Sequence, residues 1–196
     1  MKLIKPIVLA SQSPRRIHLL QQIGWNPIII PCDIPEVFDS RQTPGENAET
    51  LALQKARCVG RQVDNGIVIG ADTIVVLNGS MLGKPNDPDD AVRMLSLLSG
   101  KTHTVYTGIA LLDRPSDRHL TDIERTEVTF RELPAEEMEE YAASGSPLDK
   151  AGAYGIQDDY GAVFVTRIEG CFYNVVGLPL SRLYSRMIDF QRLLTR

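Results

Sequence analysis

Short apolar runs alternate with amphipathic segments along the first half of the chain. Residues 7–10 are apolar and predict a buried strand, and residues 28–30 predict a second one. The segment after residue 13 repeats apolar positions at helical spacing and ends at Gly24, and residues 44–63 repeat the same period. This alternation of strands and helices predicts an α/β fold with a mixed sheet and flanking helices.

The middle of the chain is richer in β-forming residues. Residues 67–77 form a long β-prone run, and Asn78-Gly79 predicts a hairpin turn that returns the chain toward Lys84. Further elements are expected as strands over residues 102–112, 120–132 and 163–168 and as helices over residues 87–98, 134–143 and 179–194. The long strands predict a second lobe within one domain of residues 1–196.

Composition narrows the class of protein. The 196 residues are 43% apolar and 23% charged, as in an ordinary globular protein, and the formal net charge is -4. That charge argues against a general nucleic-acid binder, although a few well-placed cations can still bind one small anion. Lys5 and Pro6 interrupt the N-terminal apolar stretch, and no run is long enough to span a membrane. A cytoplasmic protein that binds neither nucleic acid nor membrane is therefore expected.

Several common kinds of site have no support in the sequence. The three cysteines are far apart and form no C-x-x-C pair, which argues against a disulfide framework or a cysteine zinc site. The three histidines share no ligand spacing, and neither a P-loop nor a G-x-G-x-x-G motif is present. Any nucleotide must therefore be bound by another scheme.

Hydroxyls and guanidiniums gather where the first strand gives way to the first helix. The segment Ser11-Gln12-Ser13-Pro14-Arg15-Arg16 has Ser13 as a candidate N-cap and proline at the first helical position. A helix N-terminus attracts anions, and arginine suits bidentate contacts with phosphate. The segment predicts either a phosphate cradle or a capped surface helix with solvated arginines.

One carboxylate lies inside a strongly apolar strand. Asp72 interrupts the run of residues 67–76, and a charge in such surroundings is costly unless it is partnered. It is a candidate to hold Mg²⁺ or to orient a water, and the alternative is a buried aspartate that hydrogen-bonds a loop. Lys84, between Gly83 and Pro85, returns toward the level of Asp72 and is a candidate phosphate cation.

Residues 149–157 form a glycine-rich stretch, Asp-Lys-Ala-Gly-Ala-Tyr-Gly-Ile-Gln. Glycines let the backbone approach a ligand closely, and the alternative is a surface turn. Tyr154 within it either stacks on a base or packs against the protein.

Together these motifs resemble the Maf family of nucleotide pyrophosphatases. The resemblance rests on ordered blocks that span nearly the whole chain: residues 11–16, residues 51–56 with Lys55, residues 70–73, residues 83–85, Ser99-Gly100 with His103, Val105 and Thr107, residues 149–157, and residues 175–179. One such motif is weak evidence, but this many in order are specific.

The resemblance implies a fold, a reaction and a cofactor. The fold is expected to be similar to that of inosine triphosphate pyrophosphatases, an elongated, twisted mixed sheet in two lobes around a deep cleft. The reaction is expected to be metal-dependent hydrolysis of a nucleoside triphosphate to the monophosphate and pyrophosphate, with Mg²⁺ or Mn²⁺. Asp72 matches the proton acceptor, and Glu36, Lys55 and Lys84 match charged positions of the cleft. Glu36 and Asp72 are the predicted metal ligands.

Physical chemistry agrees with this scheme. Hydrolysis of a phosphoanhydride needs cations that hold the phosphates in line for attack. Arg15, Arg16, Lys55 and Lys84 can supply them, beside the hydroxyls of Ser11 and Ser13. Asp72 is then a general base or orients a metal-bound water.

The resemblance also indicates a subgroup. Arg15, Thr73 and Gln157 resemble the branch that hydrolyses dTTP and UTP, whereas the branch specific for 7-methyl-GTP has Trp, Gln and an acid there. The expected partner is therefore a pyrimidine nucleoside triphosphate, in nucleotide-pool house-cleaning, and a homodimer is compatible with the sequence. Two alternatives stay open: the same chemistry on a purine, and a non-catalytic nucleotide-binding regulator of cell division and septum formation.

Overall fold

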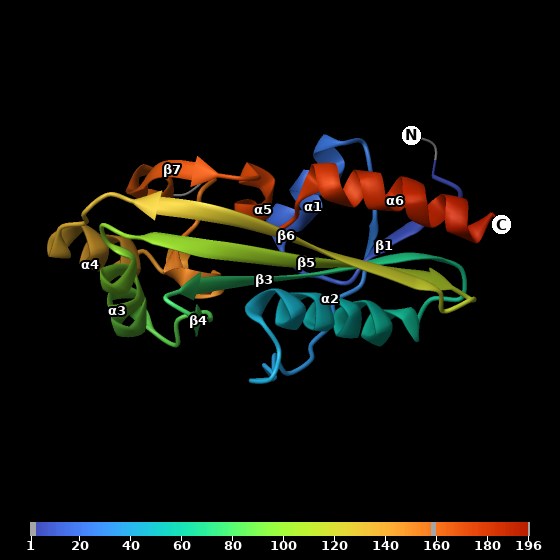
Figure 1. Ribbon diagram of the computed structural model, residues 1–196, viewed down its shortest axis with the longest axis horizontal. Helices are drawn as coiled ribbons and strands as arrows, with labels where there is room; N and C mark the ends of the chain where they lie inside the picture. Colours follow the sequence, from blue (N-terminus) through green and yellow to red (C-terminus); the bar gives the residue numbers. More distant parts are fainter. Residues whose placement is uncertain (1–2, 158–159, 196) are drawn as a thin grey trace. The chain divides into compact units, whose positions relative to one another are not determined.

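A computed structural model describes residues 3–157 and 160–195, and Figure 1 shows their helices and strands. The strands are β1 (Ile7–Leu9), β2 (Ile28–Ile29), β3 (Gly66–Leu77), β4 (Ser80–Leu82), β5 (Thr102–Arg114), β6 (His119–Phe130) and β7 (Val165–Glu169). The α-helices are α1 (Pro14–Gln22), α2 (Pro44–Gly60), α3 (Pro88–Leu98), α4 (Ala135–Ala143), α5 (Phe172–Val176) and α6 (Leu180–Leu194). Three short 3-10 segments are η1 (Ser146–Asp149), η2 (Ala151–Ala153) and η3 (Tyr160–Phe164).

All seven described strands belong to one mixed sheet. Its order is β2-β1-β3-β5-β6-β7, and β4 pairs with β3 outside this path. Strand β1 is parallel to both of its neighbours, whereas β3 pairs with β4, and β6 with β7, in antiparallel fashion. The predicted mixed α/β fold is therefore confirmed.

The chain divides into two compact units. Unit 1 comprises Met1–Asp72, Thr107–Glu124 and Gly177–Arg196, and unit 2 comprises Thr73–Tyr106 and Arg125–Val176. Three of the four unit boundaries fall within β3, β5 and β6, and the fourth follows α5.

In unit 1, α2 packs very closely on the sheet, as Figure 1 also shows. The helix begins with a capping box in which Thr43 and Glu46 satisfy each other's backbone donors. Its buried alanines pack on apolar side chains of β1, β3 and β5, and the close approach depends on two glycines. A Cβ at Gly70 would lie 2.1 Å from the Ala52 carbonyl oxygen, and a Cβ at Gly108 would lie 2.3 Å from the Ala48 carbonyl carbon.

In unit 2, an aromatic core joins the strands to α3 and α4. Phe130, Tyr141, Tyr154 and Phe164 are all buried there, and their rings meet mostly edge to face. Aromatic side chains bury large apolar areas and prefer such geometries. Ala153 and Tyr154, from the glycine-rich stretch of residues 149–157, belong to this core.

Two local predictions have clear outcomes. The turn at Asn78 and Gly79 is confirmed, since both residues adopt positive φ, of 50° and 80°, between the paired strands β3 and β4. The prediction that residues 28–30 are buried is wrong. Ile28 and Ile29 are 58% and 37% exposed, because β2 is short and lies at an edge of the sheet.

Element ends differ from the prediction by a few residues. Helix α2 ends at Gly60 and not near residue 63, and Ser13 caps α1 by backbone conformation without a side-chain hydrogen bond. Among residues 3–157 and 160–195, none of the helices combines the length and apolar character needed to cross a membrane.

The contact between α2 and β5 yields a prediction on stability. Replacing Gly108 with Ala should destabilise the protein by about 3 kcal/mol or more, because the new methyl group would overlap the α2 backbone, which cannot move aside. Urea unfolding followed by circular dichroism measures the change. Gly83→Ala is the matched control, because a Cβ at Gly83 meets nothing within 4 Å. Equal unfolding midpoints for the two variants would contradict the predicted contact.

Candidate functional site

Parallel pairing of β1 and β3 brings two of the sequence motifs together. Leu9 is in register with Ile69, and the Ala10 amide donates to the Ile69 carbonyl oxygen at 2.9 Å. The segment that starts at Ser11 therefore begins beside the part of β3 that leads to Asp72. The carboxyl ends of parallel strands are a common place for ligands.

Ser11 organises the turn into α1. Its hydroxyl is buried and accepts hydrogen bonds from the Ser13 amide at 3.2 Å and from Arg16 Nη1 at 3.3 Å. Helix α1 starts at Pro14 directly afterwards, so the partial positive charge of its N-terminus lies at this turn. Hydroxyl, helix end and guanidinium thus share one small region of unit 1, as a phosphate cradle requires.

Arg16 is held in place by the protein and is not a solvated surface arginine. Its Nε donates to the Gly177 carbonyl oxygen at 2.9 Å. Burial lowers the pKa of its guanidinium, and the Asp72 carboxylate acts in the opposite direction. Arginine stays protonated in such surroundings, so a fixed positive charge faces Asp72. Arg15, the next residue back, is half-buried.

Lys55 joins the two acids predicted to bind metal. Its Nζ donates to Asp72 Oδ1 at 2.5 Å and to Glu36 Oε1 at 2.7 Å. Lys55 projects from α2 and Asp72 from β3, and both are buried, whereas the side chain of Glu36 is 41% exposed. The structure therefore brings together three residues that are 17 to 36 positions apart in sequence.

Burial raises the pKa of Asp72 above its ordinary value, and the charge of Glu36 acts in the same direction. The cations Lys55 and Arg16 oppose that rise. Asp72 is 4% exposed, so its charge has little water to solvate it. A carboxylate whose proton affinity is raised by its surroundings is a better general base than one in water.

Glu36 and Asp72 suit a hard divalent cation. Carboxylate oxygens are the ligands that Mg²⁺ and Mn²⁺ prefer, and Lys55 shows that oxygens of both acids converge on one point. Within the described residues, no group of three or more His, Cys, Asp and Glu side chains could form a complete protein cage. Two carboxylates with the remaining positions left to substrate and water are typical of Mg²⁺ sites. The donor set fits Mg²⁺ or Mn²⁺ and does not fit structural zinc.

The remaining predicted residues belong to unit 2. Thr73 follows Asp72 on β3 and is half-buried, and Lys84 is exposed just after β4. The paired register of β3 and β4 ends with Val75 opposite Leu82, two residues before Lys84. The return of Lys84 toward the level of Asp72 stays a prediction.

Gln157 ends the glycine-rich stretch. Its Oε1 is buried and has no hydrogen-bond partner within residues 3–157 and 160–195. A buried carbonyl oxygen without a partner is costly in a folded protein. Such an atom is well suited to accept a hydrogen bond from a ligand.

Tyr154 packs inside unit 2 and does not serve as a stacking platform. It is buried against Phe130, with ring centroids 4.7 Å apart, and its hydroxyl lies 2.7 Å from Nε2 of His103. No sequence pattern links these two residues, which are 51 positions apart. Gly177 was likewise missed as a partner of Arg16, although its φ of 117° marks it as a specialised glycine.

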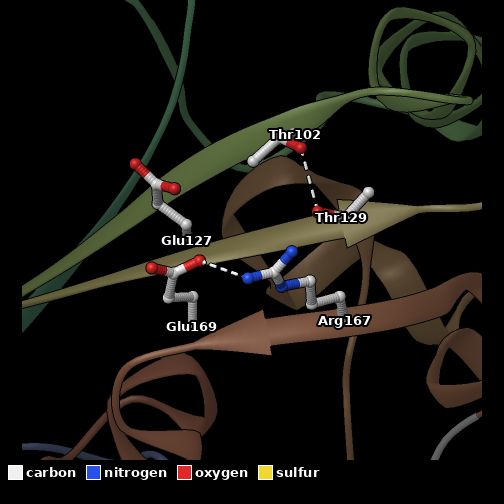
Figure 2. A pocket seen from close by; sticks show the side chains of 5 residues that line it. All are labelled: Thr102, Glu127, Thr129, Arg167 and Glu169. Carbon is white, nitrogen blue, oxygen red and sulfur yellow. Dashed lines mark hydrogen bonds and ion pairs between the residues drawn. The ribbon is translucent and has the colours of Figure 1, made fainter.

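A separate pocket lies on the outer strands of unit 2. Figure 2 shows Thr102, Glu127, Thr129, Arg167 and Glu169 around it, with Arg167 paired to Glu169 at 2.9 Å. None of the predicted site residues lines this pocket. Its one cation is already paired with an acid, so it offers no excess positive charge to a phosphate.

An α/β fold with a helix N-terminus, a fixed arginine and a carboxylate–lysine pair at one place is typical of proteins that handle phosphate groups. The comparison with protein families agrees with this class. Residues 6–190 match the family model of the Maf-like proteins, and the chain belongs to that family.

Relatives with assigned names are similar over almost their whole length. A dTTP/UTP pyrophosphatase from Dictyoglomus turgidum is 46% identical over 187 residues, which cover 95% of this chain and 96% of the relative. A dTTP/UTP pyrophosphatase from Bacillus cereus is 48% identical, with 95% and 91% covered. Among solved structures, protein VC0702 from Vibrio cholerae is 12% identical over 67% of this chain and 66% of that one, with a TM-score of 0.33.

The buried histidine yields a prediction on stability and pH. Burial lowers the pKa of His103 to about 4, below its ordinary value of 6.5. The unfolded chain therefore takes up a proton at a higher pH than the folded protein. The stability linked to His103 is complete above about pH 6.5 and is lost as the pH falls toward 4, by about 3 kcal/mol in total.

Urea unfolding at several pH values between 7.5 and 4 measures this loss. His103→Gln should flatten the slope in that window, because the glutamine amide does not titrate. His119→Gln, at an exposed position, should keep the wild-type slope. The assignment fails should His103→Gln retain the wild-type slope as well.

Proposed function

We propose that the protein hydrolyses dTTP and UTP to the nucleoside monophosphate and pyrophosphate. The observation that supports this most strongly is the buried Asp72, with its raised pKa, bonded to Lys55 and facing Arg16. Membership of the Maf-like family and the names of its relatives give the substrate class. The protein is thus a hydrolase acting on an acid anhydride, in the cleansing of nucleotide pools.

The reaction exchanges one phosphorus–oxygen bond for another. A water oxygen bonds to phosphorus, the bond between the α- and β-phosphates breaks, and pyrophosphate leaves. Asp72 accepts the proton that the attacking water gives up. Its buried carboxylate is suited to this role because its proton affinity is raised while Lys55 fixes one of its oxygens.

Cations of the site hold the phosphates. Arg16, anchored by Ser11 and by the Gly177 carbonyl, offers a guanidinium of fixed orientation. Lys55 would add a second charge, and Arg15 and the Ser13 turn would supply further contacts. Lys84, in unit 2, stays a candidate phosphate cation. Preorganised positive charge stabilises the transition state more than the ground state, because no reorganisation is needed as charge develops.

Glu36 and Asp72 would hold Mg²⁺ or Mn²⁺. The ion would supply Lewis-acid charge on the phosphate oxygens when bound. Lys55 holds the two acids close together through its two ion pairs, and its charge opposes the rise in the pKa of Asp72. The two carboxylates therefore serve the metal as well as the proton transfer.

Thr73 and Gln157 would form hydrogen bonds with the base and so determine which base is bound. A uracil or thymine ring has an N–H donor flanked by carbonyl acceptors, and a glutamine amide has one acceptor and two donor hydrogens. The buried Oε1 of Gln157 is suited to accept from the ring N–H. The cytoplasmic location and the homodimer expected from the sequence remain predictions.

A substrate panel tests the activity. Pyrophosphate release should occur with dTTP and UTP in the presence of Mg²⁺ or Mn²⁺ and stop with excess chelator, because hard carboxylate ligands are filled by these ions. The kcat/KM for ITP and GTP should be at least about tenfold lower than for dTTP, because a tenfold difference corresponds to the loss of roughly one hydrogen bond to the base. Turnover confined to purines would overturn the base assignment. Absence of turnover on the whole panel would leave a nucleotide-binding regulator of division as the better explanation.

A second experiment tests Asp72. Asp72→Asn should lower kcat for dTTP by about 10²- to 10⁴-fold, because the amide cannot accept the proton. Steady-state kinetics measure the loss, and circular dichroism checks that the fold is retained. Asp64→Asn, at an exposed position, is the matched control and should leave kcat unchanged. Wild-type turnover by Asp72→Asn would remove Asp72 from the chemistry.

A further inference from the structure

We propose that His103 and Tyr154 are positioning residues that hold Gln157 in the orientation needed to select a pyrimidine base. The inference rests on the proposed function, since the role of Gln157 is itself part of that proposal. All the residues involved lie in unit 2.

The segment that leads to Gln157 has an unusual backbone. Gly152 and Ala153 are consecutive residues with positive φ, of 71° and 61°. Left-handed backbone costs energy at a non-glycine residue such as Ala153 and is kept only where surrounding contacts impose it. The segment therefore depends on those contacts for its shape.

Three hydrogen bonds fix this segment to its surroundings. The Gly152 amide donates to the Gly83 carbonyl oxygen at 3.0 Å, and the Gly155 amide donates to the Tyr141 hydroxyl at 3.3 Å. Between them, the Tyr154 hydroxyl and His103 Nε2 lie 2.7 Å apart. The last bond is the shortest of the three, and it alone joins the segment to the long strand β5.

Water cannot readily replace either partner of the His103–Tyr154 hydrogen bond, because both side chains are buried. The two residues are only 2% and 6% exposed, and the ring of Phe130 packs edge-on against both, at 5.0 and 4.7 Å between centroids. A buried polar group that loses its partner bears the full cost of desolvation. The pair therefore strongly favours one position of Tyr154.

Gln157 follows Tyr154 by three residues, and the two residues between them are buried. Rotation of the Gln157 backbone is thus limited by its neighbours on the N-terminal side. Its buried Oε1 has no hydrogen-bond partner within the described residues. The direction of this acceptor is therefore set by the backbone that carries Gln157 and by packing, and not by a hydrogen bond to Oε1. An acceptor of this kind discriminates between bases only when its direction is fixed.

The test is Tyr154→Phe, which removes one hydroxyl and keeps the ring. The KM for dTTP and UTP should rise about tenfold, and the preference for dTTP over ITP should fall by about the same factor, as for the loss of one well-placed hydrogen bond. The kcat for dTTP should change less than about threefold, because Asp72 and Lys55 are untouched. A merely structural role would lower thermal stability without moving the preference between bases.

Tyr160→Phe is the matched control. The Tyr160 hydroxyl bonds to Glu137 at 3.2 Å on an exposed part of unit 2, so its loss should leave KM and base preference unchanged. Should Tyr154→Phe fail to fold, His103→Gln and His103→Leu replace it. The glutamine can still bond to the Tyr154 hydroxyl and should retain more of the base preference than leucine does.

A double variant that combines Tyr154→Phe with Gln157→Ala distinguishes a failure of the positioning role from a failure of the proposed role of Gln157. Gln157→Ala should remove the base preference, and adding Tyr154→Phe should then change it no further, because both act through one side chain. Additive effects, or a wild-type preference in Tyr154→Phe beside a lost one in Gln157→Ala, would overturn the positioning role and leave the proposed function intact. A wild-type preference in Gln157→Ala would overturn the role of Gln157 in the proposed function and the positioning role with it.

Discussion

The pairing of the buried Asp72 carboxylate with the Lys55 ammonium is the interaction on which the site in unit 1 depends. A lone charge at a position that is 4% exposed would be too costly to keep ionised. Lys55 can reach Asp72 only because α2 lies almost in contact with the β3 backbone. That contact in turn requires Gly70, where any side chain would overlap the Ala52 carbonyl. A packing constraint two residues away thus allows the ion pair between Lys55 and Asp72 to form.

The parallel pairing of β1 with β3 supplies the second half of the same site. It sets the Ser11 turn beside the approach to Asp72, and the turn leads at once into a helix N-terminus. Arg16 acts electrostatically on Asp72, and a bidentate contact with phosphate requires its guanidinium to have a fixed orientation. The Gly177 carbonyl and the Ser11 hydroxyl provide that orientation. A positive charge of fixed orientation therefore acts on the Asp72 carboxylate.

Local sequence was sufficient for features set by local physics. The Asn78-Gly79 hairpin, the helix that begins at Pro44 and the unusual acid in the run of residues 67–76 all follow from neighbouring residues. Edge position is a property of the whole sheet, so the exposure of Ile28 could not be predicted from its apolar neighbours. Glu36 was a candidate only through a family resemblance, since an acid in an irregular segment has no local signal, and its ion pair with Lys55 was not predicted. The His103–Tyr154 bond joins residues 51 positions apart and was not predicted at all.

Phosphate binding and base selection place different demands on the protein. Charge acts over several ångströms in all directions, so a cation serves a phosphate even when its position is inexact. A hydrogen bond to a base weakens steeply when its angle is wrong, so selection depends on direction. Lys84, the proposed phosphate cation, is exposed just after β4. The segment before Gln157, the proposed base-selecting residue, packs in a buried aromatic core and has positive φ at Gly152 and Ala153. The Gly152–Gly83 hydrogen bond connects the two, so the segment that we propose positions Gln157 also holds the backbone of the residue before Lys84.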